Sequence, residues 1–308
     1  NKMKEIKIFT PATVANISCG FDILGLCLDT VGDEMVVREV PEKGIKITKI
    51  TGQKLPLETH ENVAGVAGLA LLEKVDASVG YEIEIHKKIK PGSGIGSSAA
   101  SAAGAVFAIN ELLGKPFSKQ ELIYFAMQGE KLASGSEHAD NVSPVILGGF
   151  TLVRSYQPLD VLKINTPNDL YVTIIHPQIE VKTADARAVI KNQVSLKKMV
   201  TQMGNFGGLI SGLFTNDYDL IGRSLHDEII EPNRLVLIPE FNKVKKGVIH
   251  AGALGAGISG SGPSIFALSK GERTANFVGE TMAKIYNNTD IDYDIHISKI
   301  NQQGIKIL

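Results

Sequence analysis

The feature that most constrains this chain is the segment at residues 90–100, which reads Lys-Pro-Gly-Ser-Gly-Ile-Gly-Ser-Ser-Ala-Ala. Its three alternating glycines allow positive φ angles and let backbone N–H groups approach a ligand with no Cβ in the way. The chain from Ser97 to Leu113 is rich in Ala and free of Pro, and Gly114 follows as a C-cap, so this stretch predicts a helix. Because a helix N-terminus offers unpaired N–H donors and about half a positive charge, the segment indicates a phosphate site.

Two common phosphate-binding motifs do not describe this segment. A P-loop requires Gly-Lys followed by Ser or Thr, whereas Gly114-Lys115 is followed by Pro116. A formal dinucleotide fingerprint, Gly-x-Gly-x-x-Gly, occurs at residues 255–260, but a strand-like stretch follows it where a helix should begin. The alternative to a phosphate cradle is a tight turn that caps a buried helix.

Composition limits the partners of the chain. Its 308 residues suit two domains of about 150 residues each, and 44% of them are hydrophobic, which is enough to form large cores. Lys and Arg number 32 against 33 Asp and Glu, giving a net charge of -1. No overall basic field exists to attract nucleic acid or an anionic membrane, so an anion site has to be local.

The cysteines and the hydropathy pattern indicate where in the cell the protein is expected to be found. Cys19 and Cys27 have no metal-ligand spacing, and the seven histidines form no cluster, so neither a disulfide nor a zinc site is expected. No run of 18 apolar residues occurs, and the first residues lack the apolar region of a signal peptide. These features predict a cytoplasmic protein without a membrane span.

The pattern along the chain predicts strands and helices without internal repeats. Alternating or β-branched stretches predict strands at residues 4–9, 34–40, 45–50, 81–87, 170–176, 264–268 and 294–300. Helical spacing predicts helices at residues 62–74, 97–113, 118–131, 183–191, 196–214, 218–229, 239–251 and 271–287. Ser118 and Glu121 form a capping box, residues 145–154 are expected to be extended, and the polar stretch 155–169 is expected to be a boundary. This mixture favours an α+β fold with two layers over a doubly wound parallel sheet.

Two further clusters carry chemistry. Glu130 is expected near the end of the helix at 118–131, with Asp140 and Asn141 in the loop behind it. Carboxylates beside a phosphate site are typical of Mg²⁺, which also accepts a serine hydroxyl; the alternative is a solvated helix end followed by a turn. Residues 255–264 are rich in Gly and Ser and have the traits of a wall that closes over phosphates, or of a simple turn between helix and strand.

Three motifs in this order resemble a known family. Residues 11–22, which begin Pro-Ala-Thr-Val-Ala-Asn, residues 91–100, and residues 257–264 are similar to the three motifs of the GHMP superfamily of small-molecule kinases. Within it, the resemblance is strongest to the branch that phosphorylates L-homoserine, and it is carried by Asn16, 20–25, 138–144, 148–150, 186–187 and 231–234. At residues 17–19 the chain has Ile-Ser-Cys, where the family more often has a Gly- or Pro-containing turn.

The resemblance implies a fold and an activity. The expected fold is the two-layer, two-domain GHMP kinase fold, with a ribosomal-protein-like α/β domain at residues 1–160 and a ferredoxin-like domain at residues 161–308. The expected reaction is ATP-dependent phosphorylation of the side-chain hydroxyl of L-homoserine to O-phospho-L-homoserine, which feeds threonine biosynthesis. Independently of the resemblance, helical surfaces in the second half are candidates for the contact of a homodimer.

The resemblance also implies roles for particular residues. ATP phosphates are assigned to Pro91, Gly92, Ser93, Gly94, Ile95, Gly96, Ser97, Ser98, Gly260 and Ser261. Mg²⁺ is assigned to Ser98 and Glu130, which join Asp140 and Asn141 as the expected catalytic residues. The expected substrate-binding residues are Asn16, Asp22, Asn141, Arg187 and Arg234. Asp22 suits an ammonium group, and the two guanidinium groups suit a carboxylate.

The resemblance leaves the general base open. Related kinases have an Asp where this branch has Asn141, which cannot take a proton, and Asp140 stands next to it. Because orientation alone supplies roughly 7 to 11 kcal/mol of such a barrier, we expect the hydroxyl proton to pass to phosphate or solvent. Alternative functions are phosphorylation of mevalonate or a sugar alcohol, a nucleotide-binding regulatory protein without catalysis, and an oxidoreductase that uses the glycines at residues 255–260.

Overall fold

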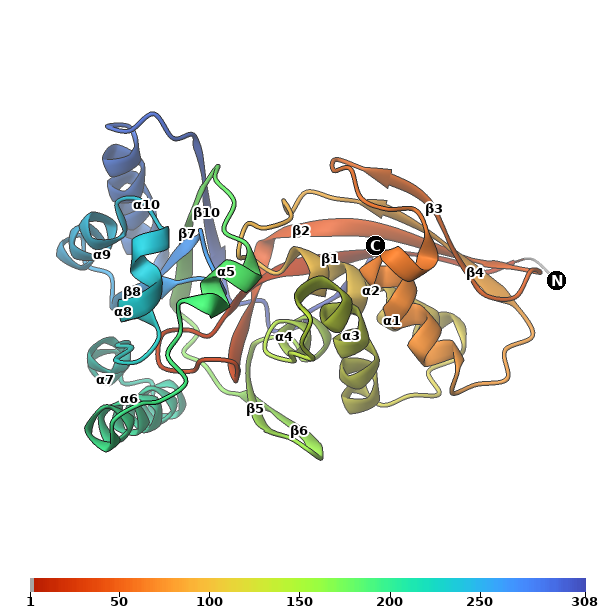
Figure 1. Ribbon diagram of the computed structural model, residues 1–308, viewed down its shortest axis with the longest axis horizontal. Helices are drawn as coiled ribbons and strands as arrows, with labels where there is room; N and C mark the ends of the chain where they lie inside the picture. Colours follow the sequence, from red (N-terminus) through yellow and green to blue (C-terminus); the bar gives the residue numbers. More distant parts are fainter. Residues whose placement is uncertain (1–2) are drawn as a thin grey trace.

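The computed structural model describes residues 3–308 as two β-sheets with helices packed against them (Figure 1). The first sheet and its helices form one end of an elongated molecule, and the second sheet and its helices form the other. The expected mixture of helices and sheets in two domains is confirmed. None of the helices in residues 3–308 has the length and apolar character that a bilayer crossing requires.

The first sheet has seven strands. They are β1 (Glu5–Ala15), β2 (Leu24–Val40), β3 (Ile45–Thr51), β4 (Gly80–His86), β5 (Phe150–Tyr156), β6 (Leu159–Ile164) and β11 (Lys306–Ile307). The order is β11-β1-β2-β4-β3, and β5 pairs with both β2 and β6. The β3–β4 pair is parallel and the other pairs are antiparallel. The four strands predicted in this half are confirmed, although β1 and β2 are longer than their alternating stretches.

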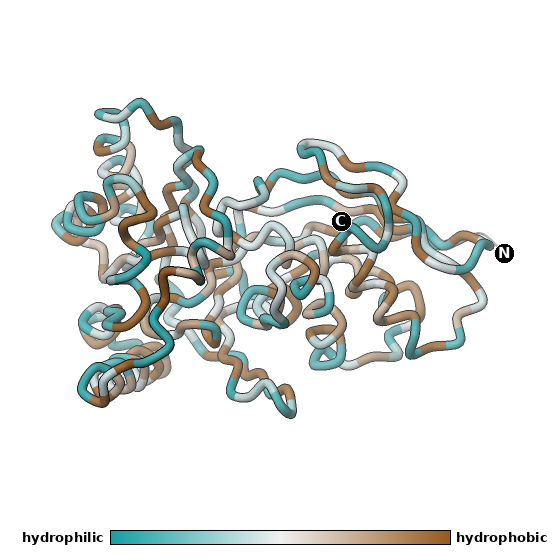
Figure 2. The backbone as a smooth tube through the Cα atoms, in the orientation of Figure 1, coloured by the Kyte–Doolittle hydropathy of each residue, from teal (hydrophilic) through white to brown (hydrophobic). Residues whose placement is uncertain are grey.

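Helices cover one face of this sheet. They are α1 (Val63–Leu72), α2 (Ser97–Leu112), α3 (Lys119–Ser134) and α4 (Val142–Leu147), with a short 3-10 helix, η1 (Thr59–Glu61). Alanine allows α2 to pack closely, because most of its residues are fully buried between the sheet and its neighbours α1 and α3. Figure 2 shows apolar stretches along α1 and α2. The capping box of Ser118 and Glu121 is present as predicted.

One element in this half differs from the prediction. Residues 145–154 were expected to be extended, but residues 145–147 belong to α4 and only residues 150–154 belong to β5. Pro144 stands in the first turn of α4, where a missing N–H removes no helix hydrogen bond. Gly148 and Gly149, both with φ of 74°, then end the helix and turn the chain into the strand.

The second sheet has four antiparallel strands in the order β10-β7-β9-β8. They are β7 (Leu170–Pro177), β8 (Gly255–Ile258), β9 (Ile265–Lys270) and β10 (Tyr293–Lys299). Its helices are α5 (Thr183–Ala188), α6 (Leu196–Thr215), α7 (Tyr218–Ser224), α8 (Glu231–Arg234), η2 (Leu235–Leu237), α9 (Phe241–His250) and α10 (Glu272–Tyr286). The order and the β-α-β-β-α-β sequence are those of a ferredoxin-like domain, as predicted. The helix expected at 218–229 ends earlier, at Ser224.

The two sheets meet in a shared apolar core. One face of β7 and β9 packs with residues of β1, β2, β5, α6 and α7 in a single buried cluster, while the opposite face packs against α9 and α10. The domain boundary at residue 160 stays a prediction. That residue lies inside β6, the chain leaves the first sheet after Ile164, and β11 returns to pair with β1.

The close approach of β2 to the loop before α4 gives a first prediction. A Cβ added to Gly25 would lie 1.8 Å from the backbone oxygen of Asp140. We expect Gly25→Ala to lower the free energy of unfolding by about 1–3 kcal/mol, because backbone must move to make room. Gly204→Ala is the control, since its Cβ would meet nothing within 4 Å, and it should raise stability by about 0.5–1 kcal/mol. Equal effects of the two variants in urea titrations would contradict this account.

Candidate active site

A cavity of about 660 Å³ opens between the two domains, and both domains contribute to its walls. One wall is the glycine loop, which we define as residues 91–96, together with the first turn of α2. The opposite wall comes from the second domain, through the segment 180–187, Arg234 and Gly260. Figure 1 shows α5, which carries part of this segment, lying between the two ends of the molecule. The cavity therefore exists only where the domains meet.

The glycine loop has the backbone that its sequence predicts. Gly92, Gly94 and Gly96 have φ angles of 71°, 83° and 74°, which L-residues with side chains seldom adopt. A Cβ on Gly94 would lie 2.6 Å from the backbone oxygen of Ser259. Within residues 3–308, no backbone carbonyl accepts a hydrogen bond from the N–H groups of Gly94, Gly96, Ser97 or Ser98. These donors remain for an anion at the N-terminus of α2.

Nine of the ten predicted phosphate residues line the cavity. Pro91, Gly92, Ser93, Gly94, Gly96, Ser97, Ser98, Gly260 and Ser261 line the cavity. Ile95 does not, because its side chain packs in the core between the sheets and its N–H donates to Ser93 Oγ at 3.4 Å. Ile95 thus holds the loop in place by packing.

The glycine-rich motif at residues 257–264 binds the backbone carbonyls of the glycine loop. Ser259 Oγ donates to Gly94 O at 2.7 Å, and Ser264 Oγ donates to Ser93 O at 2.5 Å. These two serines were not predicted as site residues, and nothing local in the sequence distinguishes them from other serines of the motif. They occupy loop carbonyls and leave the loop N–H groups to a ligand.

A buried ion pair lies under the first turn of α2. Lys87 and Asp33 are both fully buried and paired, and Lys87 Nζ also donates to Ser97 O at 2.9 Å and to Ser101 Oγ at 3.1 Å. Burial lowers the pKa of Lys87, and the charges of Asp33 and Glu130 oppose this shift. This pair was not predicted from the sequence. The available signal was that Lys87 occupies an inward position, two residues after Ile85, in the alternation of its strand.

Glu130 and Ser98 fit a metal site. Burial raises the pKa of Glu130 to about 7, whereas Ser98 and the charge of Lys87 lower it. Among residues 3–308, Glu130 Oε1 is buried without a hydrogen-bond partner, an arrangement that a bound cation would relieve. No group of three or more His, Cys, Asp or Glu is placed to hold a metal in the described chain. Mg²⁺ requires one or two protein carboxylates when phosphate and water oxygens complete its shell.

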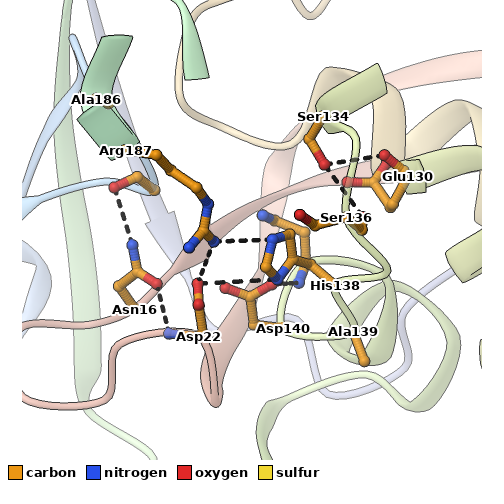
Figure 3. A network of polar contacts seen from close by, with 12 residues as sticks. Asn16, Asp22, Glu130, Ser134, Ser136, His138, Ala139, Asp140, Ala186 and Arg187 are labelled. Carbon is orange, nitrogen blue, oxygen red and sulfur yellow. Dashed lines mark hydrogen bonds and ion pairs between the residues drawn. The ribbon is translucent and has the colours of Figure 1, made fainter. Parts of the chain in front are cut away.

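Opposite charges meet at the other end of the cavity (Figure 3). Arg187 Nη2 lies 2.8 Å from Asp22 Oδ1 and 2.8 Å from His138 Nε2. A guanidinium can only donate, so Nε2 of His138 is the accepting, unprotonated nitrogen. Burial lowers the pKa of His138, Asp22 opposes this shift, and Arg187 and Arg234 add to it. His138 was not predicted as a site residue, although it stands in the motif at 138–144.

Arg234 is fixed in the same region. Its Nε donates to Ala186 O at 2.9 Å and its Nη1 to Gly260 O at 3.4 Å. Burial lowers its pKa to about 10, with Arg187 adding to the shift. The guanidinium carbons of Arg187 and Arg234 lie 5.3 and 5.2 Å from the ring centroid of Phe21, so one aromatic ring stabilises both cations. Phe21 was also missed as a site residue.

The loop with the unusual sequence has an unusual backbone. Asn16, Ile17 and Ser18 all have positive φ, at 71°, 47° and 64°, which is a strained conformation for three residues with side chains. Asn16 Oδ1 accepts the N–H of Asp22 at 2.9 Å, and Asn16 Nδ2 donates to Gly260 O at 3.0 Å. Asn16 lines the cavity and also holds Asp22 in position.

Asp140 lies beside this group and is almost fully buried. Burial raises its pKa to about 7, and the charges of Asp22 and Glu130 raise it further, whereas Arg187 lowers it. Tyr156, which the sequence analysis missed, ties the region together: its hydroxyl donates to Asp22 O at 2.7 Å and accepts the N–H of Ala139 at 3.2 Å. Its position on β5 explains why only the folded chain reveals this role.

Family models match both domains. A model described as "GHMP kinases N terminal domain" matches residues 62–149, and one described as "GHMP kinases C terminal" matches residues 209–288. The first range contains the glycine loop, Glu130 and Asn141, and the second contains Arg234 and Gly260. With the two-domain fold and the cavity between the domains, these matches define a small-molecule kinase, and the chain belongs to the GHMP kinase family.

Individual relatives narrow this class. The homoserine kinase of Chlorobium phaeobacteroides (strain BS1) is 46% identical over 320 residues, which cover 99% of this chain and 100% of the relative. The crystal structure of homoserine kinase from Cytophaga hutchinsonii has a TM-score of 0.95 at 52% identity, covering 99% of this chain and 97% of that one. L. major mevalonate kinase, at 18% identity and a TM-score of 0.69 over 96% of both chains, shares the fold alone. Within the GHMP kinases, the chain therefore groups with the homoserine kinases.

The raised pKa of Glu130 predicts a pH-dependent effect of its replacement. Because the folded-state value of about 7 exceeds the ordinary 4.5, the carboxyl stabilises the fold at low pH and loses that contribution as the pH rises through 7. The loss amounts to about 1.4 kcal/mol per pKa unit. Glu130→Gln should therefore raise the Tm relative to wild type more at pH 8 than at pH 5, measured without divalent cations.

Glu121 on the same helix is the control. Hydrogen bonds from Ser118 lower its pKa, so it is ionised at both pH values, and Glu121→Gln should change the Tm equally at pH 5 and pH 8. A pH-independent Tm difference for Glu130→Gln would show that Glu130 titrates normally.

Proposed function

We propose that this chain transfers the γ-phosphoryl group of ATP to the side-chain hydroxyl of L-homoserine, giving ADP and O-phospho-L-homoserine. One observation carries the proposal: the carboxylate of Asp22 and the guanidinium groups of Arg187 and Arg234 share one cavity with the glycine loop. An α-amino acid has an ammonium for Asp22 and a carboxylate for the arginines, which mevalonate and sugar alcohols cannot both match. The homoserine kinases among its relatives support the same assignment.

The polyphosphate would lie against the glycine loop, with the free N–H groups of Gly94 and Gly96–Ser98 as donors. Ser98 and Glu130 would hold Mg²⁺, whose chemistry is to neutralise charge on the phosphate oxygens. Lys87, buried under the first turn of α2, holds the carbonyl of Ser97 and adds positive charge near Glu130. The chain thereby positions and neutralises the reacting groups, which is most of what phosphoryl transfer requires.

The acceptor oxygen attacks the γ-phosphorus, the bond from phosphorus to the leaving ADP oxygen breaks, and the hydroxyl proton has to leave. We propose that the proton passes to a phosphoryl oxygen or to solvent. In this proposal Asn141 lies near the reacting hydroxyl, and Asp140 contributes to the charge of the site without taking the proton. Asp140 Oδ1 already accepts the N–H of Asn141 at 3.2 Å, which occupies one of its oxygens.

The product would feed threonine biosynthesis.

A cytoplasmic location agrees with Cys19 and Cys27, which are buried and unpaired. A homodimer is proposed on the second domain, where α6 exposes apolar side chains, among them Leu196, Val200 and Met203; a monomeric mass in light scattering at micromolar concentration would argue against it.

The acceptor is tested with a substrate panel. The purified protein, MgATP and either L-homoserine, mevalonate or a sugar alcohol are incubated, and the products are identified by mass. We expect a phosphorylated product from L-homoserine alone, because only an amino acid matches both charges at Asp22 and Arg187. Turnover of mevalonate at a comparable kcat/KM, or of none of the three, would overturn the proposed function.

The proton route is tested with Asp140→Asn. A general base typically contributes about 10²- to 10⁴-fold, so we expect this variant to keep kcat within about tenfold of wild type if Asp140 is not the base. Asp160→Asn, on β6 outside the cavity, is the control. A loss above 100-fold with unchanged binding of ATP and L-homoserine would identify Asp140 as the base. The pH profile gives a second test, because the pKa of Asp140 is about 7. A kcat that rises through pH 7 in wild type at saturating Mg²⁺, and does not rise in Asp140→Asn, would also identify Asp140 as the base.

A further inference from the structure

Thr13 contacts Gly96 and Asn141, two residues that line the cavity. Thr13 lies fully buried in β1, and its N–H donates to Ile95 O at 3.0 Å. Its hydroxyl donates to Asn141 Oδ1 at 2.6 Å. A Cβ on Gly96 would lie 2.1 Å from Thr13 Oγ1 and 3.1 Å from Asn141 Oδ1, so glycine is needed for this contact to form. Thr13 thus touches both the glycine loop and the residue expected beside the reacting hydroxyl.

The contact fixes the side-chain amide of Asn141. An amide has an accepting oxygen on one side and a donating NH₂ group on the other, and the two have nearly the same shape. A hydroxyl has one proton, which Thr13 gives to Oδ1. Asn141 makes no capping hydrogen bond to α4 that would compete for this oxygen. With Oδ1 held by Thr13, the Nδ2 donors are the part of the amide that is left for a ligand.

We propose that Thr13 is a positioning residue that orients Asn141 so that Nδ2, and not Oδ1, is offered to the acceptor hydroxyl and the transferring phosphoryl group. This inference rests on the proposed function and deepens it. An N–H donor binds a lone pair of the acceptor oxygen, while another lone pair forms the bond to phosphorus. The hydroxyl proton is then directed away from Asn141, toward a phosphoryl oxygen or solvent, as ADP leaves.

Thr10 provides a matched comparison within the same strand. It is also fully buried, and its hydroxyl donates to Ala100 O at 2.7 Å. Replacing either threonine by Val removes one buried hydroxyl at nearly constant volume, so both variants test the cost of that loss to folding. Only Thr13 binds a side chain of the cavity, so only its replacement should change the reaction.

The test is steady-state kinetics with MgATP and L-homoserine. Thr13→Val should lower kcat by about 10- to 100-fold and leave the KM for ATP within about twofold, because orientation and not nucleotide binding is lost. Thr13→Ser keeps the hydroxyl and should restore kcat to within about threefold of wild type. Thr10→Val should keep the wild-type kcat even where its Tm falls. In an Asn141→Ala background, Thr13→Val should cause no further loss, since it acts through Asn141.

A normal kcat for Thr13→Val, or the same loss in the Asn141→Ala background, would overturn the inference. A second measurement does not depend on the acceptor. The side-chain NH₂ signals of Asn141 in a ¹H–¹⁵N NMR spectrum, assigned by their absence in Asn141→Ala, should shift in Thr13→Val and stay in place in Thr10→Val. Unchanged NH₂ signals in Thr13→Val would also overturn the inference. If instead the wild-type protein is inactive on L-homoserine, that result would overturn the proposed function.

Discussion

The site depends on one constraint: the protein binds the carbonyl groups at residues 93–95 of the glycine loop, and the N–H groups at residues 94 and 96–98 have no backbone partner within residues 3–308. The hydroxyl groups of Ser264 and Ser259 donate to the carbonyls of Ser93 and Gly94. The N–H of Thr13 donates to the carbonyl of Ile95. These donors come from both domains. A loop rich in glycine can turn its peptide groups easily, and these bonds select the orientation that suits an anion at the N-terminus of α2.

The same bonds make the site a product of domain assembly. The apolar cluster shared by both sheets holds β1 and β2 against β7 and β9, and the cavity opens beside it. Asp22 and Arg187 belong to different domains, yet they form an ion pair 2.8 Å long. An amino acid with both charges can therefore be held at one end of the cavity while the phosphate is held at the other, which is the arrangement that in-line transfer requires.

Local patterns predicted the parts of this structure that local physics decides. The glycine loop, the alanine-rich helix and the Ser118 capping box carry their signals within a few residues, as do the strands with alternating or β-branched sequences. The short strands β6, β8 and β11 lack such a signal and were not predicted. The carboxylate of Glu130 was predicted from the sequence pattern, and the motif resemblance added Asp22 and the two arginines; all four line the cavity. Contacts between distant segments escaped prediction: the Lys87–Asp33 pair, the Tyr156 hydroxyl and the serines behind the loop depend on neighbours that only folding supplies. Residues 142–147 form a helix that tolerates Pro144 because this residue falls in the first turn, and periodicity alone does not reveal so short a helix.

A crystal structure with a nonhydrolysable ATP analogue and L-homoserine tests the central claim most directly. The account predicts phosphate oxygens within hydrogen-bond distance of the N–H groups of Gly94, Gly96, Ser97 and Ser98, with the loop carbonyls still bound to Ser259 and Ser264. The amino-acid carboxylate is expected at the two arginines. Phosphates bound elsewhere, or a glycine loop that releases its carbonyls to bind the ligand, would contradict the account.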